Sequence, residues 1–461
     1  MFYAPPSSLS GSDSIRFRAI TRSNIAKSSA WERMSPDLRE AVMVVSAVLP
    51  FRTNAYVVDE LIDWSVVPDD PMFQLTFPQR GMLSSDDYRQ MAEVIRGGDD
   101  KKVAAAANRM RLQLNPHPAG QMTHNVPKFQ GRPLHGVQHK YPETVLFFPS
   151  KGQTCHAYCT FCFRWAQFVG MEELKFSNDE IEQLIEYLKV HKEVRNVLFT
   201  GGDPMIMTAK VLARYIEPLL DPKLKHVHTI RIGTKAVAYW PQRFVSDPDA
   251  DDLLRLFEKI IASGRHVAIM GHYSHPVELS TDVAREAVRR IRGAGANIRM
   301  QSPIIRHVND DPNCWVRLWR TGVRLGCIPY YMFVERDTGA RNYFELPLVR
   351  CWEIYRNAYS RVSGLSRTVR GPSMSAFPGK VHVLGVHEIH GQKLFVLQFL
   401  QARDPSLVRR PFFAKFDPRA VWFDDLEPAT EKDRMFFVRP RPAEREEKLL
   451  GLGSLVPVAD E

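Results

Sequence analysis

Three cysteines fall within eight residues in the run Cys155-His156-Ala157-Tyr158-Cys159-Thr160-Phe161-Cys162. Three thiolates this close together can hold three irons of a four-iron, four-sulfur cubane, and no fourth cysteine lies nearby to hold the last iron. The open iron is then free to bind a group that is not protein. The run therefore predicts an iron–sulfur centre that performs one-electron chemistry beside a substrate pocket.

Other uses of three neighbouring cysteines stay open on spacing alone. A disulfide is disfavoured because such short loops strain its geometry and because no secretion signal precedes the run. A structural zinc site wants a fourth Cys or His at a suitable offset, and His156 lies too close in the chain to complete a tetrahedron easily. Inert buried cysteines are common singly but rarely occur in threes. We favour the cluster over these alternatives.

The composition predicts a globular protein with an anionic ligand. The chain has 461 residues, 44% of them hydrophobic and 25% charged, so a sizeable core is expected. Its formal net charge is +10, but the 62 Lys and Arg are spread along the chain without a basic block or an aromatic nucleic-acid motif. We therefore expect an anionic cofactor or substrate and no nucleic acid.

The ends of the chain and its cysteines predict a cytoplasmic protein. Residues 1–11 are rich in Ser and Pro and lack the charged-then-apolar order of a signal peptide. No run approaches the roughly 18 apolar residues of a membrane span. Six cysteines, three of them clustered, suit a reducing compartment. We expect no membrane association.

Residues 142–334 alternate between short apolar runs and amphipathic stretches. Strands are predicted over residues 144–148, 196–200, 228–234, 266–273, 296–305 and 327–334. Helices are predicted over residues 179–190, 251–262, 281–292 and 312–325. Repeated strand–helix units give parallel strands with helices outside, so we predict an α/β barrel or an arc of one. Chemistry in such folds sits at the C-terminal ends of strands, where the cysteine run and the run Gly201-Gly202-Asp203-Pro204 should share one rim.

The flanking regions differ from this centre and set the predicted domains. Helices are predicted over residues 36–48 and 85–97, whereas short β runs are predicted over residues 380–386, 393–399, 420–423 and 435–438. The Pro- and Glu-rich tail from residue 440 should be loose. We divide the chain into a helical N-terminal domain of residues 1–138, a central domain of residues 139–374 and a β-rich C-terminal segment of residues 375–461.

Phe161 before the last cysteine, together with Gly-Gly-Asp-Pro after the next strand, resembles the radical S-adenosylmethionine superfamily. The resemblance narrows to the lysine 2,3-aminomutase family and runs in register from about residue 139 to residue 380. Each piece is weak alone, but their order and spacing are specific. The pieces are His139-Lys140-Tyr141-Pro142, Leu198-Phe199-Thr200-Gly201-Gly202-Asp203-Pro204, Ile230-Arg231-Ile232-Gly233-Thr234-Lys235, Gly271-His272-Tyr273-Ser274-His275-Pro276, Val308-Asn309-Asp310-Asp311, Pro329-Tyr330-Tyr331-Met332-Phe333, Ser363-Gly364-Leu365 and Pro378-Gly379-Lys380.

The resemblance implies a fold and a set of site residues. The fold is a partial (βα)6 barrel of the radical S-adenosylmethionine type, with the helical N-terminal region and a small β-rich C-terminal extension. A [4Fe–4S] cluster is implied on Cys155, Cys159 and Cys162. S-adenosylmethionine is implied on Gly201, Gly202, Asp203, Pro204, Thr234, His272 and Gln301, with the Asp203 carboxylate on its ammonium group. Pyridoxal 5′-phosphate is implied on Lys380, as an imine, and on Lys140 and Tyr141, while Arg164 grips the substrate carboxylate.

The activity implied by the resemblance is a radical isomerisation. The reduced cluster splits the C–S bond of S-adenosylmethionine, and the 5′-deoxyadenosyl radical takes a hydrogen from Cβ of an amino acid. The amino group then migrates from Cα to Cβ through a pyridoxal phosphate aldimine. The implied partners are a small amino acid substrate and an electron donor such as a flavodoxin or ferredoxin, and a homo-oligomer is compatible with the resemblance.

Departures from the family bear on the substrate. Arg336 and Ser373 stand where the family places two aspartates that hold the ammonium group of lysine. A guanidinium beside a buried ammonium group is strongly unfavourable, so lysine is disfavoured and an acidic or neutral side chain, such as that of glutamate, fits better. Asp337, one residue further on, restores the family's charge only if the loop shifts.

The binding of pyridoxal phosphate is altered as well. The family's two phosphate-gripping arginines align with Lys140 and Thr144, and its Gly-rich approach to the lysine becomes Ser375-Ala376-Phe377-Pro378-Gly379. The family's zinc cysteines have no counterpart, because Cys314, Cys327 and Cys351 lie in stretches that resemble a buried core.

Three interpretations stay open. The first is an aminomutase for an amino acid other than lysine. The second is a radical S-adenosylmethionine enzyme without pyridoxal phosphate, which abstracts hydrogen for epimerisation, dehydrogenation or another rearrangement. The third is a non-catalytic nucleic-acid-binding or iron-sensing protein. The Gly-Gly-Asp-Pro run argues against the third, since a sensor needs no loop that binds a methionine.

Overall fold

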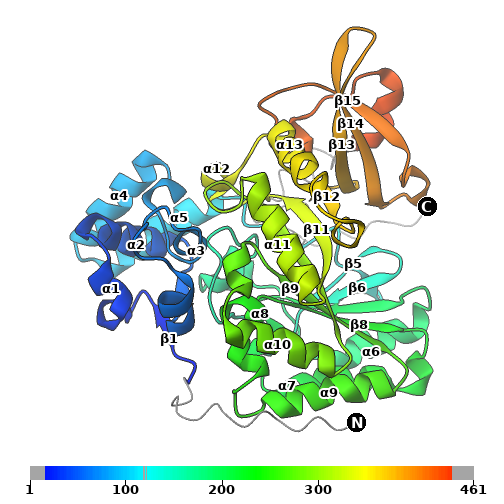
Figure 1. Cartoon of the computed structure of the whole chain (residues 1–461), viewed down its shortest axis with the longest axis horizontal. Helices are drawn as coiled ribbons and strands as arrows, with labels where there is room; N and C mark the ends of the chain where they lie inside the picture. The colour runs from blue at the N-terminus through cyan, green and yellow to red at the C-terminus, as the bar shows by residue number, and fades with distance from the viewer. Residues whose placement is uncertain (1–15, 118–119, 121, 439–461) are drawn as a thin grey trace.

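An 11-stranded sheet runs through the computed structural model in the order β15-β14-β13-β12-β11-β10-β9-β8-β7-β6-β5 (Figure 1). The structure describes residues 16–117, 120 and 122–438. The predictions for residues 1–11 and for the tail from residue 440 lie outside this range. Because neighbouring strands are also consecutive in the chain, each connection within the sheet joins adjacent strands.

Parallel strands form the centre of the sheet. They are β6 (Thr144–Phe147), β7 (Asn196–Phe199), β8 (Thr229–Thr234), β9 (His266–His272), β10 (Asn297–Ile304), β11 (Ile328–Val334) and β12 (Arg370–Ser375). The six predicted strands are confirmed as β6 to β11. The prediction lacks β12, because Gly371 and Pro372 within it are residue types that strands usually exclude.

Helices connect the parallel strands, and several of them lie along one side of the sheet (Figure 1). They are α6 (Ile181–Val190), α7 (Ala209–Ile216), α9 (Ala250–Ala262), α10 (Asp282–Gly293), α11 (Pro312–Arg324) and α13 (Leu348–Tyr359). In α9 the buried residues Leu253, Phe257 and Ile260 share one helical face. The sheet stays open at β5 (Val137–Tyr141), which pairs antiparallel with β6. The predicted partial barrel is therefore confirmed.

The sheet reverses direction after β12. The antiparallel strands β13 (Gly379–Ile389) and β14 (Gln392–Ala402) confirm two of the predicted β runs. The strand β15 (Pro411–Lys415), which is not among the predicted runs, pairs antiparallel with β14. The predicted runs at residues 420–423 and 435–438 are wrong, because this part of the chain forms the 3-10 turns η15 (Phe423–Asp425) and η16 (Glu431–Phe436). The aromatic side chains of these turns pack against side chains of the sheet, whereas their backbones add no strand to it. Phe436, for example, stacks on Phe412 with ring centroids 4.5 Å apart.

The N-terminal region is mainly helical and lies beside the sheet (Figure 1). Its elements are β1 (Ala19–Thr21), α1 (Ser29–Arg33), α2 (Pro36–Val48), β2 (Arg52–Asn54), α3 (Pro71–Thr76), α4 (Ser85–Arg96) and α5 (Asp100–Gln113). Helices α2 and α4 confirm the two predicted helices. The short elements β3 (Lys128–Phe129), β4 (Arg132–Pro133), α8 (Ala236–Tyr239) and α12 (Arg341–Phe344) complete the fold. The domain boundaries at residues 139 and 375 stay a prediction.

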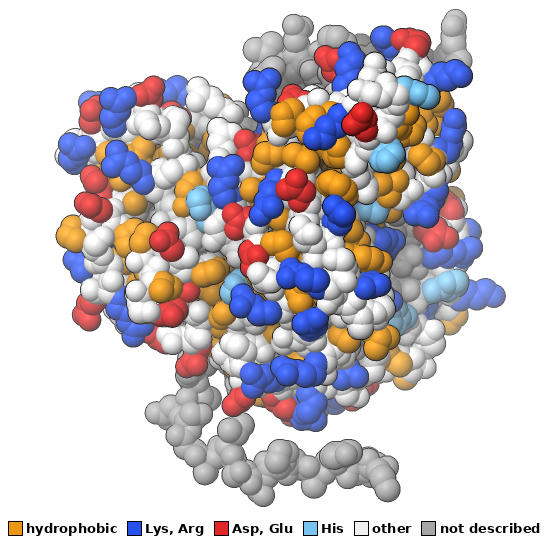
Figure 2. Space-filling model, turned by 45° about the horizontal axis from the view of Figure 1, so that its top comes forward, with side chains coloured by type: hydrophobic (Ala, Val, Ile, Leu, Met, Phe, Trp, Pro, Cys, Tyr) orange, Lys and Arg blue, Asp and Glu red, His pale blue; other side chains and the backbone are white. Residues whose placement is uncertain are grey.

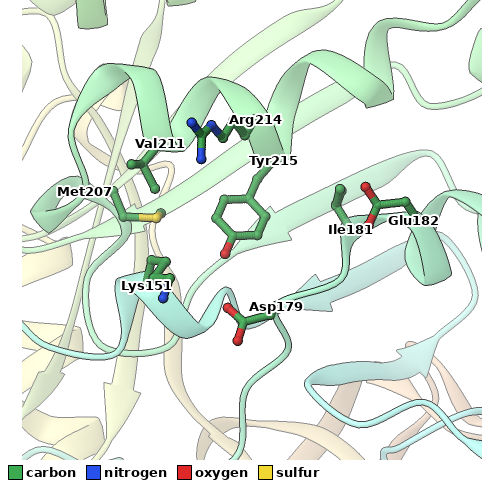
Figure 3. Close-up of a pocket in the computed structure, with 8 residues that line it drawn as sticks. All are labelled: Lys151, Asp179, Ile181, Glu182, Met207, Val211, Arg214 and Tyr215. Carbon is green, nitrogen blue, oxygen red and sulfur yellow. The ribbon is translucent and has the colours of Figure 1, made fainter.

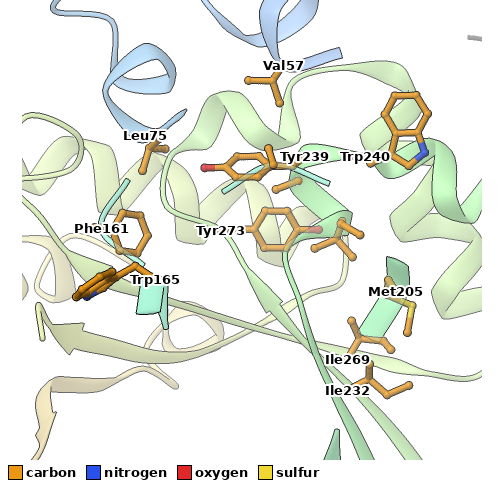
Figure 4. Close-up of a cluster of buried hydrophobic side chains, with 14 of the residues drawn as sticks. Val57, Leu75, Phe161, Trp165, Met205, Ile232, Tyr239, Trp240, Ile269 and Tyr273 are labelled. Carbon is orange, nitrogen blue, oxygen red and sulfur yellow. The ribbon is translucent and has the colours of Figure 1, made fainter. Parts of the chain in front are cut away.

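A shared core joins the N-terminal region to the sheet. Figure 4 shows Val57 and Leu75 of that region in one cluster with Phe161 of the cysteine run and with Ile232 and Ile269 of β8 and β9. All five side chains are buried. The cysteine run is thus anchored between the helices and the strand ends. Among the described residues, every helix is too short or too polar to cross a bilayer.

Candidate active site

The loop that carries the three cysteines follows β6, and the N-terminal region holds it in place. The N–H of Tyr158 donates a hydrogen bond to the carbonyl of Arg52 at 2.8 Å. The N–H of Thr160 donates to the carbonyl of Leu75 at 3.0 Å. Both acceptors lie about 85 to 105 residues earlier in the chain, so the shape of the loop depends on tertiary structure.

The three thiols lie near enough to influence one another. Burial, followed by Asp203 and the other two thiols, raises the pKa of Cys155 well above its usual value. Burial also raises the pKa of Cys159 to about 12 and that of Cys162 to about 11. No three His, Cys, Asp or Glu side chains in the described part of the chain converge on a single ion. Three thiols on one short loop suit a cluster whose irons each take one thiolate, and the charge of the iron would favour the thiolate forms.

His156 packs against aromatic rings and does not join the thiols. Its ring lies 5.0 Å from that of Phe17 and 6.4 Å from that of Trp240, between centroids. Burial lowers the pKa of His156 to about 3, so the ring is neutral near pH 7. The structure thus gives this histidine a packing role.

The turn Gly201-Gly202-Asp203-Pro204 ends β7 beside the chain that leads into the cysteine loop. Gly201 has a φ of +138°, a conformation that side chains rarely adopt. A Cβ atom on Gly202 would lie 2.4 Å from the backbone nitrogen of Thr154. Glycine is therefore needed for these two segments to approach, whatever the turn binds.

The Asp203 carboxylate is buried and points toward the end of β8. Its Oδ2 accepts hydrogen bonds from the Thr234 hydroxyl at 2.9 Å and from the N–H groups of Lys235 and Ala236 at 2.8 and 3.0 Å. Its Oδ1 accepts from the N–H of Met205 at 2.9 Å. Burial raises the pKa of Asp203, and these hydrogen bonds oppose that shift. The carboxylate thus ties the ends of β7 and β8 together, while its role toward the methionine ammonium group stays a prediction.

The variant Asp203→Asn should be less stable by about 2–4 kcal/mol. The substitution turns one carboxylate oxygen into an NH₂ group, which cannot accept hydrogen bonds from the neighbouring donors. Urea unfolding of the wild type and the variant would measure the loss. Asp282→Asn, at an exposed position on α10, is the matched control and should change stability by less than about 0.5 kcal/mol. If the free energy of unfolding changed by an equally small amount in both variants, the stabilising role of the Asp203 carboxylate would be contradicted.

A cavity of about 250 Å³ lies between the sheet, the cysteine loop and the C-terminal strands. It brings together six of the predicted site residues, namely Lys140, Tyr141, Arg164, Gln301, Arg336 and Lys380. Its five basic side chains are Lys140, Arg164, Arg231, Arg336 and Lys380, and among the described residues no Asp or Glu lines it. The cavity is therefore suited to a ligand with more than one negative charge.

Two guanidinium groups at this cavity lack hydrogen-bond partners within the described structure. Arg164 is buried, its Nε and Nη1 are unpaired, and its guanidinium carbon lies 4.1 Å from the ring centroid of Phe148. Arg336 has an unpaired buried Nε and lies over the rings of Phe163 and Trp422, at 5.4 and 5.6 Å. Buried donors are normally satisfied, so anionic groups of a ligand are the natural acceptors here.

Lys380 extends from β13 into the cavity, and its amine has an unusually low pKa. Its Nζ lies 4.1 Å from the ring centroid of Tyr331. Burial, followed by the nearby Arg231 and Arg370, lowers the pKa of Lys380 to about 7. Near neutral pH a large fraction of this amine is unprotonated and can attack an aldehyde. The residue thus fits the imine-forming role that the resemblance implies.

The other residues predicted to bind cofactors include Lys140, Tyr141 and His272. Lys140 donates from Nζ to the carbonyl of Ala376 at 2.6 Å, and burial, followed by Arg403, lowers its pKa well below the usual value. The hydroxyl of Tyr141 is buried without a partner in the described structure. Burial also keeps His272 neutral by lowering its pKa. These residues are placed, but their ligands stay predictions.

Two residues considered for the substrate lie outside the cavity lining. Ser373 is fully buried on β12, whereas Ser375 of the same strand lines the cavity. Asp337 has its carbonyl bonded by the Asn115 amide at 2.6 Å, and its Oδ1 lies 3.9 Å from the Nε of Arg336. Asp337 therefore stays in its loop, and Arg336 is the residue that lines the cavity.

Several lining residues are absent from the predicted site. Arg231 lies in the middle of β8, and a charge within a buried parallel strand is a signal that could have found it. Asn125 and Gln401 reach the cavity from the N-terminal region and from β14. No local pattern marks these two amides, because the pairing of distant segments places them there.

A second cavity, of about 440 Å³, is lined by charges of both signs. Its charged residues are Lys151, Arg214, Asp179 and Glu182, and Figure 3 shows them beside Tyr215. On the face shown in Figure 2, basic side chains are interspersed with acidic and apolar ones. The remaining cysteines are buried, as predicted, at positions Cys314, Cys327 and Cys351.

Known proteins resemble the chain over the cysteine loop and well beyond it. Residues 150–312 match the family model of the Radical SAM superfamily. A protein of Aquifex aeolicus, provisionally named L-lysine 2,3-aminomutase, is 29% identical over 86% of this chain and 92% of its own length. The L-lysine 2,3-aminomutase of Methanococcus maripaludis is 27% identical over 51% of each chain. The solved structure of a radical SAM methyltransferase from Sphaerobacter thermophilus is 18% identical, with a TM-score of 0.36, over 51% of this chain and 68% of that one.

Proposed function

Because the chain belongs to the radical S-adenosylmethionine superfamily and to its lysine 2,3-aminomutase family, we propose that it moves an amino group from Cα to Cβ of an acidic amino acid. The observation that carries this proposal is the cavity lined by five basic and no acidic side chains among the described residues. The guanidinium groups of Arg164, Arg231 and Arg336 would repel an ammonium side chain there, whereas they would stabilise a second carboxylate.

The rim of the cavity is assigned to the substrate. Arg164, two residues after Cys162, is placed to hold the α-carboxylate near the cluster, and its unpaired Nε and Nη1 offer two donors. Arg336 is placed to hold the side-chain carboxylate. Planar guanidinium groups bind carboxylates through two parallel hydrogen bonds, so the two arginines together select for length as well as charge.

The residues for the two remaining groups follow the family. We assign the cluster to Cys155, Cys159 and Cys162, and S-adenosylmethionine to Gly201, Gly202, Asp203, Pro204, Thr234, His272 and Gln301. When bound, the cluster supplies the electron that breaks the C–S bond, and pyridoxal phosphate supplies an aldehyde that carries the migrating nitrogen. Lys380 holds that aldehyde, with Lys140 and Tyr141 beside it. Aromatic residues of the C-terminal segment, Trp422 among them, exclude water from the rim.

The wider setting of the enzyme is also proposed. An amino acid substrate and a reductant are general to the superfamily, and a flavodoxin or ferredoxin as donor, a homo-oligomer and a cytoplasmic location stay predictions. The β-rich segment from residue 375 is assigned to the site because it supplies Lys380 and Gln401.

An anaerobic screen of free amino acids tests the proposal. Protein with a reconstituted cluster, dithionite, S-adenosylmethionine and pyridoxal phosphate should release 5′-deoxyadenosine and form a β-amino acid from glutamate or aspartate but not from lysine. Release of 5′-deoxyadenosine with an epimerised or dehydrogenated product, and without need for pyridoxal phosphate, would instead favour the alternative enzyme. Absence of 5′-deoxyadenosine with every amino acid would remove both.

The bond between Lys380 and pyridoxal phosphate should form faster as the pH rises through about 7, because loss of the ammonium proton gives the nucleophilic amine. A free lysine would reach this point only near a pH of about 10.4. Stopped-flow absorbance between about pH 5.5 and 9, with borohydride trapping, measures the midpoint. Lys380→Ala should form no trapped bond, whereas Lys415→Ala, at an exposed position, should behave like the wild type. A midpoint near 10 would contradict the prediction.

A further inference from the structure

Two successive tyrosines of β11, Tyr330 and Tyr331, line the cavity. Residues of a regular strand alternate between its faces, but the register between β10 and β11 shifts so that Met300 pairs with Pro329 and Gln301 with Tyr331. Tyr330 is left without a cross-strand partner, and this bulge allows Tyr330 and Tyr331 both to line the cavity. Their ring centroids are 4.4 Å apart in an edge arrangement.

Cations from three other strands gather around this tyrosine pair. The guanidinium carbon of Arg370 on β12 lies 4.6 Å from each ring centroid, and the Nζ of Lys380 on β13 lies 4.1 Å from that of Tyr331. Arg231 on β8 also lines the cavity, and its charge acts on Lys380 and on the phenol of Tyr331. The side chains of all three cations lack hydrogen bonds and ion pairs among residues 16–117, 120 and 122–438. Because Lys380 is the amine that bonds to the aldehyde, we call only Arg231 and Arg370 the inner cation cluster.

We propose that the inner cation cluster binds the phosphate group of pyridoxal phosphate. This inference rests on the proposed function only for the identity of the cofactor. It supplies a phosphate site where one of the arginines that the family uses is replaced by Thr144, whose hydroxyl can only donate a hydrogen bond. The tyrosine hydroxyls add donors to those of the two guanidinium groups.

The position of Lys380 explains why a phosphate, rather than a substrate carboxylate, belongs here. In pyridoxal phosphate the aldehyde and the phosphate arm stand on neighbouring ring carbons, so a cofactor bonded to Lys380 keeps its phosphate near that lysine. Arg231 and Arg370 both act on Lys380 and on the phenol of Tyr331. Arg164 lies over Phe148 and Arg336 over Phe163 and Trp422, whereas Arg370 and Lys380 lie over Tyr331. A cofactor bonded to Lys380 would therefore have its phosphate near Arg231 and Arg370.

A phosphate near pH 7 carries close to two negative charges, and one cation is a poor match for it. Two guanidinium groups can each form two parallel hydrogen bonds with phosphate oxygens. Arg231 lines the cavity and is half-buried, whereas Arg370 is exposed beside the cavity lining, so a phosphate held by both would keep contact with water. Such a site would neutralise the two guanidinium groups near the tyrosine pair.

The experiment compares pyridoxal phosphate with pyridoxal, which has the aldehyde but no phosphate. Both react with the same Lys380, so the ratio of their affinities isolates the phosphate. Full-length protein is titrated with each compound, and the bond is read by absorbance and borohydride trapping, without any need for the cluster or for turnover. Wild-type protein should prefer pyridoxal phosphate, and Arg231→Gln and Arg370→Gln should each reduce that preference by roughly tenfold to a hundredfold.

Matched variants separate the outcomes. Arg255→Gln, at an exposed position on α9, should keep the wild-type preference. Arg231→Lys should retain part of it, and inorganic phosphate should compete with pyridoxal phosphate but not with pyridoxal. Circular dichroism checks that each variant is folded.

Equal affinity of the wild type for both compounds, binding of neither, or an unchanged preference in folded Arg231→Gln and Arg370→Gln would overturn the phosphate site. Failure of the aminomutase proposal looks different. In that case the preference and its loss in the variants persist, while no amino acid gives a β-amino product.

Discussion

Cys159→Ala should lose the cluster iron and should release no 5′-deoxyadenosine, whatever amino acid is supplied. Two thiolates cannot hold a cubane that needs three protein ligands, and alanine offers no donor in place of the third. Iron content and the absorbance of the anaerobically reconstituted protein measure the first effect, and chromatography of the cleaved nucleotide measures the second. Cys155→Ala and Cys162→Ala should behave in the same way, because the three thiols form one donor set.

The core cysteines provide the matched control. Cys327→Ala and Cys351→Ala make the same change at buried positions away from the loop. They should keep the iron and the nucleotide cleavage, with stability lower by about 1 kcal/mol because a sulfur is removed from a packed core. A cluster that survives in Cys159→Ala, or disappears in Cys327→Ala, would sink the assignment of the metal site.

Arg336→Asp should reverse the substrate preference from acidic amino acids toward lysine. The Arg336 guanidinium lines the cavity above Phe163 and Trp422, with Asp337 at 3.9 Å as its nearest carboxylate. Exchanging the cation for an anion makes the second carboxylate of glutamate face a like charge and gives an ammonium group a partner. The ratio of kcat/KM for glutamate to that for lysine should fall by roughly a hundredfold or more.

Arg336→Gln separates removal of the charge from its reversal. This variant should lose most of the preference for acidic side chains without gaining activity on lysine. Competition assays with pairs of amino acids, scored by the β-amino product, measure the ratio. Selectivity that is unchanged in Arg336→Asp would show that another part of the cavity chooses the substrate.

Local patterns are enough to predict six of the seven parallel strands and the helices α6, α9, α10 and α11, but they do not predict α7 and α13. Apolar runs and amphipathic stretches reflect burial on both faces of a sheet and on one face of a helix, and burial of this kind leaves a periodic trace in the chain. The seventh parallel strand leaves no such trace, because Gly371 and Pro372 interrupt its pattern and only pairing with β11 makes it a strand. The aromatic runs near Phe423 and Phe436 leave a misleading trace, because their rings serve packing across a sheet.

The candidate site likewise has features that local sequence patterns reveal and features that only the tertiary structure creates. The cysteine loop and the Gly-Gly-Asp-Pro turn are visible in the order of residues, because each is a compact set of residue types whose chemistry depends on short spacing. Lys380 is implied only by the resemblance to the family. The charge of the cavity is not visible in this way: Lys140, Arg164, Arg231, Arg336 and Lys380 are separated by up to 240 residues and become one field only when β5, β8 and β13 enter the same sheet. The sequence shows which residues are neighbours along the chain. Burial, the loss of solvent and the combined electrostatic field of distant side chains arise only when distant segments fold together.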